Sequence, residues 1–335
     1  MRYVELKDVQ PGNVVGLPVY NNNGRLLINT GAILNAKNIK KLKELNISAI
    51  SIEDKISEGI DVSDNISQKI KNKTVKHLKT LNIDKIEKDA AKIVNEIIDC
   101  NELYEYFNIK TFENFTYEHS LSVATYSAMM GYACGFDISE IKDLTLAGLL
   151  HDIGKYAIDK AIIEKNGKLT EKEYTEIKKH PAFGYNMVQS NYNLKSTVKV
   201  SILEHHENED GSGYPRHLTG KNIYKFAKII HIADVYDAII SKRPYKDKAS
   251  SKEAINYIIS QTGTMFDETY VNTFIQIIPA FPRGSIVKLN DGREAIVLRN
   301  DKSHIEQPDI RIIETSELIK LSKEDNLTID EIIQR

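Results

Sequence analysis

The central region restricts the fold more than any other part of this chain, because helical patterns dominate from Thr111 to about Pro279. Within this region, the stretch from His119 to His206 alone holds five of the nine histidines of the chain. His119 precedes the apolar run "SLSVATYSAMMGYACGF", and His151 directly follows "LTLAGLL". The pattern predicts a mainly α domain, a helical bundle whose histidines lie at or beside helix ends.

The two flanking regions have strand patterns instead. Residues 1–60 contain short apolar runs, and Asn22-Asn23-Gly24 between two of them predicts a hairpin. A helix is expected in residues 35–47 and a strand in 48–53, whereas residues 61–85 are polar and predicted to connect. A helical pattern opens the next region at 86–107. Alternation around Asn290-Asp291-Gly292 predicts a small β appendage. The predicted domains are an α+β module at 1–85, the helical domain at 86–280 and a short β tail at 281–335.

Composition removes several classes of function. Lys+Arg 45 against Asp+Glu 47 gives a formal charge of −2, so no basic field indicates a nucleic acid polymer or an anionic membrane. Cys100 and Cys134 are the only cysteines, which argues against a disulfide framework and for a reducing compartment. No stretch of about 18 apolar residues occurs. A soluble, cytoplasmic protein is expected.

Histidines and aspartates in the central region have the composition of a metal site. His151-Asp152 ends one helical run, His180 and His205-His206 end two others, and Asp234 lies inside "KFAKIIHIADVYDAII". Imidazole with carboxylate and without thiolate suits Zn, Mn or Fe better than Ca or Mg. A single histidine at a helix end is more often a cap or a buried polar group, but the whole set favours metal binding.

The motifs in this region resemble those of the HD-GYP domain family. They are "EHS" at 118–120, "LLHDIGK" at 149–155, "KKHPAFG" at 178–184, "HHENEDGSGYP" at 205–215 and "IADVYDAIISKRPYK" at 232–246. The resemblance covers roughly residues 112–280 and is specific, because five separated motifs recur in order. It implies an HD-type helical bundle with the activity of bacterial metal-dependent phosphodiesterases that hydrolyse cyclic di-GMP.

The resemblance also implies roles for individual residues. The positions of the family's metal ligands are occupied by His119, His151, Asp152, His180, His205, His206 and Asp234. Asp152 would bridge two metal ions and, with Lys155, would be catalytic. The substrate would be held by Lys155, Gly213, Tyr214, Arg243 and Lys246. Iron or manganese is favoured over zinc.

One position departs from the family's pattern. Members with a three-metal site carry a glutamate one helical turn before the first ligand histidine, and here that position is Phe115. Residues i and i+4 share a helix face, so Phe115 is predicted to pack beside the cluster while Glu118 points away from it. Two metal ions per chain are therefore expected rather than three.

The expected function is hydrolysis of cyclic di-GMP to pGpG, or onward to GMP, by a hydroxide activated by two metals. The alternatives are hydrolysis of another cyclic dinucleotide, such as cyclic GMP-AMP, and non-catalytic binding by a nucleotide sensor or adaptor. A homodimer or partner-protein contact through the N-terminal module stays open. Structural roles are expected for His77, His217 and His304. For His231 a buried polar role is favoured over support of a ligand through a hydrogen bond, and Asp237 could orient a ligand or a lysine.

Overall fold

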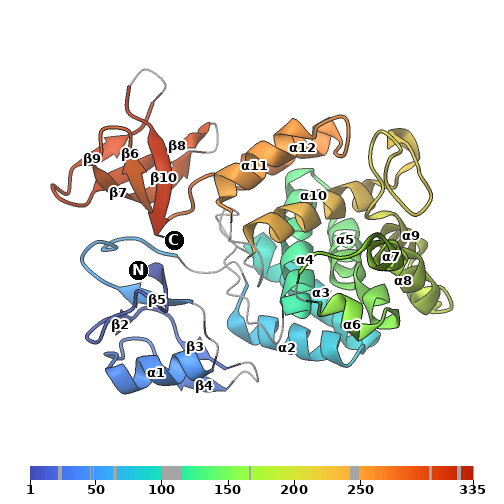
Figure 1. Ribbon diagram of the computed structural model, residues 1–335, viewed down its shortest axis with the longest axis horizontal. Coiled ribbons are helices and arrows are strands. Elements are labelled where there is room, and N and C mark those ends of the chain that lie inside the picture. The colour runs from blue at the N-terminus through green and yellow to red at the C-terminus, as the bar shows by residue number, and fades with distance from the viewer. Residues whose placement is uncertain are drawn as a thin grey trace.

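The computed structural model describes residues 1–21, 25–45, 47, 49–62, 66–99, 115–165, 167–241, 249–301, 304–322 and 326–334. Figure 1 shows three parts: a large helical domain, a small α+β module at the N-terminus and a β-sheet at the C-terminus. The predicted mainly α class with these two flanking parts is confirmed. Among the described residues, no helix has both the length and the apolar character needed to cross a membrane.

The helical domain is built around α4 (Phe115–Ala133), which is buried from Glu118 to Gly131. A helix that is apolar on all faces must be covered on all faces. Its neighbour α5 (Ile138–Leu150) begins at an Asp137 capping box and approaches closely where Gly148 faces the backbone of Ala124. The remaining helices are α2 (Gln68–Lys79), α3 (Ile83–Asp99), η2 (Ile153–Ala157), α6 (Lys160–Ile163), α7 (Glu171–Ile177), α8 (His180–Val188), α9 (Ser196–Glu204), η3 (Gly220–Asn222), α10 (Lys225–Ile240), α11 (Ser251–Ser260) and α12 (Glu268–Ile277).

The N-terminal module places one helix on a small sheet. The strands β1 (Arg2–Glu5), β5 (Ala49–Glu53) and β2 (Val14–Val15) form an antiparallel sheet in the order β1-β5-β2. The strands β3 (Val19–Tyr20) and β4 (Leu26–Ile28) pair separately. The helix α1 (Ala36–Glu44) buries Ile39 and Leu42, and an Asn35–Asn38 capping box fixes where it begins. Residues 22–24 of the predicted hairpin turn lie outside the described residues.

The C-terminal sheet has five antiparallel strands in the order β10-β6-β7-β8-β9. Their bounds are β6 (Ile286–Leu289), β7 (Glu294–Asp301), β8 (His304–Ile312), β9 (Leu318–Lys320) and β10 (Ile329–Gln334). The predicted turn at Asn290-Asp291-Gly292 joins β6 to β7, with Gly292 at a φ of +88° that glycine adopts without strain.

The two ends of the chain meet beside the helical domain (Figure 1). Ile296 of the C-terminal sheet packs against Ile60 and Val62. Arg311 Nη2 donates to the carbonyl oxygens of Ile56 at 2.6 Å and Glu58 at 2.9 Å. The N-terminal module therefore rests against the last sheet although some 250 residues separate them in sequence.

The segment at 61–85, predicted to connect two domains, contains α2. Val75 and Leu78 of this helix lie in the same hydrophobic core as α3, α4 and α5. The boundaries 1–85, 86–280 and 281–335 remain predictions. Of the helix expected at 86–107, α3 accounts for the residues up to Asp99, and residues 100–114 lie outside the described part of the chain.

Candidate metal centre

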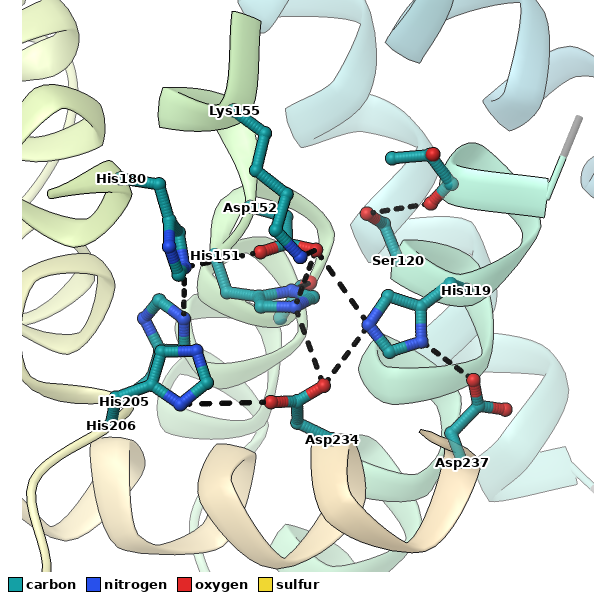
Figure 2. A network of polar contacts seen from close by, with 12 residues as sticks. His119, Ser120, His151, Asp152, Lys155, His180, His205, His206, Asp234 and Asp237 are labelled. Atoms are coloured by element: carbon teal, nitrogen blue, oxygen red, sulfur yellow. Dashed lines mark hydrogen bonds and ion pairs between the residues drawn. The ribbon is translucent and has the colours of Figure 1, made fainter. Parts of the chain in front are cut away.

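The seven histidines and aspartates proposed as ligands come from five helices or helix ends and converge at one point (Figure 2). His119 lies on α4, and His151-Asp152 follows α5. His180 begins α8, His205-His206 follows α9, and Asp234 lies on α10. All are buried except His206, which is half-buried. The structure thus brings together residues up to 115 positions apart, from 119 to 234.

The ligand-capable atoms form two groups of three. One group comprises His180, His205 and His206, the other His119, His151 and Asp152, and within each group the atoms lie within 4.8 Å of one another. Asp152 faces both groups. Its Oδ1 is 3.3 Å from His180 Nε2, and its Oδ2 is 3.4 Å from His151 Nε2 and 3.7 Å from His119 Nε2. One carboxylate therefore lies between two sets of nitrogen ligands.

Asp234 makes a second connection between the same groups. Its Oδ1 is 3.0 Å from His119 Nε2, and its Oδ2 is 3.9 Å from His206 Nδ1. Figure 2 shows both contacts, one on each side of the carboxylate. Asp152 and Asp234 thus both face the cluster of histidine side chains.

Hydrogen bonds to backbone carbonyls set the tautomer of three of the histidines. The Nδ1 atoms of His151, His180 and His205 each lie 2.8 Å from a carbonyl oxygen three residues earlier in the chain. A carbonyl oxygen can only accept, so each Nδ1 carries the proton and each Nε2 presents a lone pair. Two of these lone-pair atoms, on His180 and His205, face each other at 3.1 Å. That arrangement is repulsive unless a cation or a proton lies between them.

His119 is oriented by a carboxylate instead. Its Nδ1 donates to Asp237 Oδ2 at 2.6 Å, which turns Nε2 toward Asp152 and Asp234. Asp237 is buried one helical turn after Asp234. The predicted supporting role of Asp237 is therefore confirmed in geometry, and such partners raise the basicity of a ligand histidine.

The ionisation states of His180, His205, His206 and Asp152 suit cation binding. Burial alone would lower the pKa of His119, but Asp234 and Asp237 outweigh it and raise this pKa. Burial lowers the pKa of His180 to about 4, and burial also holds the pKa values of His205 and His206 well below their ordinary value. Burial alone would raise the pKa of Asp152, but Lys155 and His151 outweigh it and hold this pKa well below its ordinary value. Neutral imidazoles and ionised carboxylates are the forms that bind a metal.

Two buried polar atoms indicate whether this set of histidines and aspartates fits a metal ion. His151 Nε2 and Asp152 Oδ1 are inaccessible to solvent and have no hydrogen-bond partner among the described residues. A buried polar atom without a partner costs free energy, and native proteins tolerate few of them. A divalent cation between the two groups would satisfy both atoms. The donor set of imidazole nitrogens and carboxylate oxygens therefore fits a transition-metal ion.

Lys155 lies at the edge of the cluster. The helix α5 ends at Leu150, so Lys155 belongs to the 3₁₀ turn η2, and its Nζ is 2.5 Å from Asp152 Oδ2. Gly154, one residue earlier, packs so closely on α8 that a Cβ would collide with the backbone of His180 and Gly184. This glycine lets η2 lie directly against α8, which brings Asp152 within reach of His180.

The loop after His206 folds back on the cluster. The ring of Tyr214 stacks on the ring of His206, with centroids 4.8 Å apart and planes inclined by 27°. The Tyr214 amide donates to the carbonyl of His206 at 3.0 Å. Tyr214 is therefore beside a proposed ligand, at the place where the sequence motif predicted a substrate contact.

Comparison with known proteins agrees with this geometry. Residues 108–270 match the family model described as HD domain. The chain is 34% identical over 230 residues to the cyclic di-GMP phosphodiesterase PA4108 of Pseudomonas aeruginosa, covering 67% of this chain and 55% of that protein. This central region is an HD domain of the HD-GYP family.

Two further proteins are similar to this HD-GYP chain. The 3'3'-cGAMP-specific phosphodiesterase 1 of Vibrio cholerae is 39% identical over 147 residues, 42% of this chain and 33% of that protein. The chain thus spans about half or less of the length of either curated relative. The solved HDG"Y"P protein Bd1817 from Bdellovibrio bacteriovorus shares the fold, with a TM-score of 0.51 at 18% identity over 81% of this chain and 97% of that chain.

The glycine of the Gly-Tyr-Pro motif has a role that the sequence argument did not foresee. A Cβ at Gly213 would collide with the backbone of His206, Glu207 and Asn208. The absence of a side chain there is required by packing within the HD-GYP loop itself. A contact between Gly213 and substrate remains a prediction.

Sequence reasoning missed two buried glutamates that hold this loop. Glu207 is 2% exposed, and its carboxylate accepts from the amides of Arg216 at 2.6 Å and Leu218 at 2.9 Å. Glu204 accepts from Arg216 Nη1 and from the Tyr224 amide, each at 2.9 Å. The only signal in the sequence is that both glutamates flank the histidine pair.

The remaining predicted residues have mixed outcomes. Arg243 and Lys246 lie outside the described residues. Phe115 begins α4 and is half-buried, and its packing beside the cluster stays a prediction. His231 is buried and donates to the carbonyl of Glu207, in keeping with the buried polar role that the sequence favoured. His77 lies 2.5 Å from the buried Asp89, away from the cluster, in keeping with a structural role.

Proposed function

We propose that this protein is a metal-dependent phosphodiesterase that hydrolyses cyclic di-GMP to pGpG, or onward to GMP. The observation that carries the proposal is Asp152, whose two oxygens face separate groups of imidazole ligands. A carboxylate in that position can hold two cations at a fixed separation. The similarity to a Pseudomonas aeruginosa cyclic di-GMP phosphodiesterase over 230 residues supports the choice of substrate.

The proposed cofactor is a pair of divalent ions, iron or manganese. His180, His205 and His206 would hold one ion, His119 and His151 the other, and Asp152 would bridge them, with Asp234 contacting both groups. Bound there, two ions would supply a nucleophilic hydroxide at neutral pH and stabilise charge on the phosphodiester oxygens. Such ions also balance the charges of Asp152 and Asp234.

The chain's own side chains would place the substrate. The ammonium group of Lys155 lies beside Asp152 and would meet a phosphodiester oxygen next to the ions. Tyr214 would contact a guanine or a phosphate from its place on His206. We assign further phosphate contacts to Arg243 and Lys246 on their place in the family's motif. In this scheme Asp152 and Lys155 are the catalytic residues.

Turnover with defined substrates tests the proposal. Protein loaded anaerobically with Fe(II) or with Mn(II) is incubated with cyclic di-GMP or 3'3'-cyclic GMP-AMP, and the products are separated by chromatography. We expect faster hydrolysis of cyclic di-GMP. Faster hydrolysis of cyclic GMP-AMP would instead assign the activity of the similar Vibrio cholerae protein. Tight binding without turnover of either compound would indicate a nucleotide sensor.

Metal stoichiometry tests the number of ions. We expect two per chain, from elemental analysis and from anomalous scattering of crystals grown anaerobically, because Phe115 offers no ligand atom one turn before His119. A third fully occupied ion near His119 would show that another residue replaces the carboxylate and that this interpretation of Phe115 is wrong.

A further inference from the structure

A lysine and two tyrosines form a cluster immediately outside the metal centre. Lys178 Nζ lies 4.7 Å from the ring centroid of Tyr174 and 5.4 Å from that of Tyr214. Lys178 follows α7, Tyr174 lies on α7, and Tyr214 belongs to the Gly-Tyr-Pro loop. Two segments about 40 residues apart therefore hold one ammonium group between two aromatic rings.

The charge of Lys178 is not neutralised by any acidic side chain in the described part of the chain. Its neighbour Lys179 makes the ordinary surface contact, with Nζ 2.5 Å from Glu176 Oε2. Lys178 instead rests on ring faces, which attract a cation but leave its hydrogen-bond donors unused. The ammonium group can therefore donate hydrogen bonds to a bound anion.

The cluster is continuous with the site. The Tyr214 ring stacks on the His206 ring, with centroids 4.8 Å apart, and lies 5.4 Å from Lys178 Nζ. Lys178 Nζ in turn lies 4.7 Å from the Tyr174 ring, so an unbroken row of contacts leads from His206 to Tyr174. The last of them, Tyr174, is 50% exposed. An exposed aromatic ring beside a nucleotide-hydrolysing centre offers a stacking surface for a base.

We propose that Tyr174, Lys178 and Tyr214 form a second substrate subsite, which binds the part of a cyclic dinucleotide that is not being hydrolysed. This inference rests on the proposed function. Lys178 pairs with the second phosphodiester group, and Tyr174 stacks on a base. The reason is charge: the ions and Lys155 meet the phosphodiester that is cleaved, whereas the other phosphodiester carries its own negative charge, which Lys178 can meet in addition to the contacts assigned to Arg243 and Lys246.

The subsite predicts different behaviour toward two substrates. Bis(4-nitrophenyl) phosphate has one phosphodiester group and no base, so it reaches the metal centre without needing Lys178. Replacement of Lys178 by methionine is expected to raise KM for cyclic di-GMP about 10- to 100-fold, the loss of one charge-assisted hydrogen bond. KM for bis(4-nitrophenyl) phosphate and the metal content are expected to stay unchanged.

Three matched variants sharpen the experiment. Lys178→Arg keeps the charge and is expected to restore most of the affinity for cyclic di-GMP. Lys179→Met removes the adjacent lysine, which is already paired with Glu176, and is expected to behave as wild type. Tyr174→Ala removes the exposed ring and is expected to raise KM for cyclic di-GMP alone. Equal losses on both substrates in Lys178→Met, or no change on either, would overturn the subsite.

Failure of the proposed function gives a different result. A wild-type protein that hydrolyses bis(4-nitrophenyl) phosphate but not cyclic di-GMP would refute the substrate. Calorimetric titration of cyclic di-GMP into the metal-loaded wild type and Lys178→Met then decides the subsite. Weaker binding by the variant supports it, and equal binding, or no binding by either protein, refutes it.

Discussion

Asp152 is the single residue on which the proposed chemistry of the centre depends most. Its Oδ1 has no hydrogen-bond partner among the described residues, while its Oδ2 pairs with Lys155. Burial of an ionised carboxylate is tolerated only where cations compensate it. The side chain is therefore placed for its charge and not for packing.

Asp152→Ala is expected to lower cyclic di-GMP hydrolysis about a hundredfold or more and to reduce the metal content, because the shared carboxylate is lost. Far-UV circular dichroism should show that the helices remain. Glu164→Ala is the control, since the only ion pair of Glu164 among the described residues is an exposed one with Lys160. Substantial turnover by Asp152→Ala with unchanged metal content would remove Asp152 from the mechanism.

At the scale of single residues, the convergence of the seven proposed ligands could be predicted from the sequence because five motifs recur in order. Which histidine each supporting residue orients could not be predicted. Asp237 reaches His119 from 118 positions away, and Lys178 reaches Tyr214 only through the folding of the loop. Which carboxylate is buried, and against what, depends on tertiary packing that no local pattern encodes.

Among the elements, the Gly-Tyr-Pro loop depends on buried carboxylates rather than on its own turns. The backbone amides of Arg216 and Leu218 donate to the Glu207 carboxylate instead of to a backbone carbonyl of the loop. Glu204 fixes the return of the loop to α10 through the Tyr224 amide. These contacts set the position of the Tyr214 ring on His206.

Glu207→Gln is expected to destabilise the protein by about 1–3 kcal/mol, because one of two charge-assisted acceptors becomes an amide donor facing a backbone N–H. We expect KM for cyclic di-GMP to rise while the metal content stays near wild type. Urea denaturation and steady-state kinetics measure the two effects. The control is Asn208→Ala in the same loop, which removes only an exposed bond to Ser212. Identical behaviour of the two variants would refute the role of Glu207.

Some element boundaries are set by local sequence signals and others by tertiary contacts. The capping boxes at Asn35 and Asp137 and the turn at Asn290-Asp291-Gly292 are local and lie in the sequence. The change from α5 to the 3₁₀ turn η2 after Leu150 is not local, because it follows from the contact of Gly154 with α8. A short sequence motif can show that a helix ends near a given residue, but it does not show which other helix that residue packs against.

Across the whole molecule, ionic contacts join elements that are distant in sequence. Lys228 on α10 contacts Asp267 Oδ2 at 2.8 Å and Glu209 Oε1 at 3.0 Å, so it ties α10 to the N-terminus of α12 and to the Gly-Tyr-Pro loop. Similarly, Arg311 ties the last sheet to the N-terminal module. Hydrophobic patterns and turn motifs predicted the three parts of the chain but not these contacts. The expected cytoplasmic location and an interaction through the N-terminal module stay predictions.

The contact of Asp267 predicts a dependence of stability on pH. Burial alone would raise the pKa of Asp267, but Lys228 outweighs it and lowers this pKa below the ordinary value of 3.8. The folded state then binds its proton at lower pH than the unfolded state, so the contribution to stability is present above about pH 4 and is lost as the pH falls through the lowered pKa.

Asp267→Asn keeps the cap on the Thr269 amide and removes the charge. At pH 7 the free energy of unfolding of the variant is expected to be about 1–3 kcal/mol lower than that of wild type, and this difference should shrink below pH 4. Urea denaturation at pH 7, 5 and 3 measures it. A difference that is the same at all three values would show that the ionised form of Asp267 is not the stabilising one.

Three of the histidines proposed as ligands also have a structural role, which follows from the carbonyl groups that bind their Nδ1 atoms. Gly148, Ile177 and Ile202 lie in the last turns of α5, α7 and α9, where backbone carbonyls have no partner inside the helix. The imidazoles therefore terminate the helices as well as facing the cluster. Because the negative ends of three helix dipoles also point there, the backbone itself adds attraction for cations. Removal of any one of these histidines uncaps a helix, so in this protein the metal centre and the ends of its scaffold cannot be altered independently.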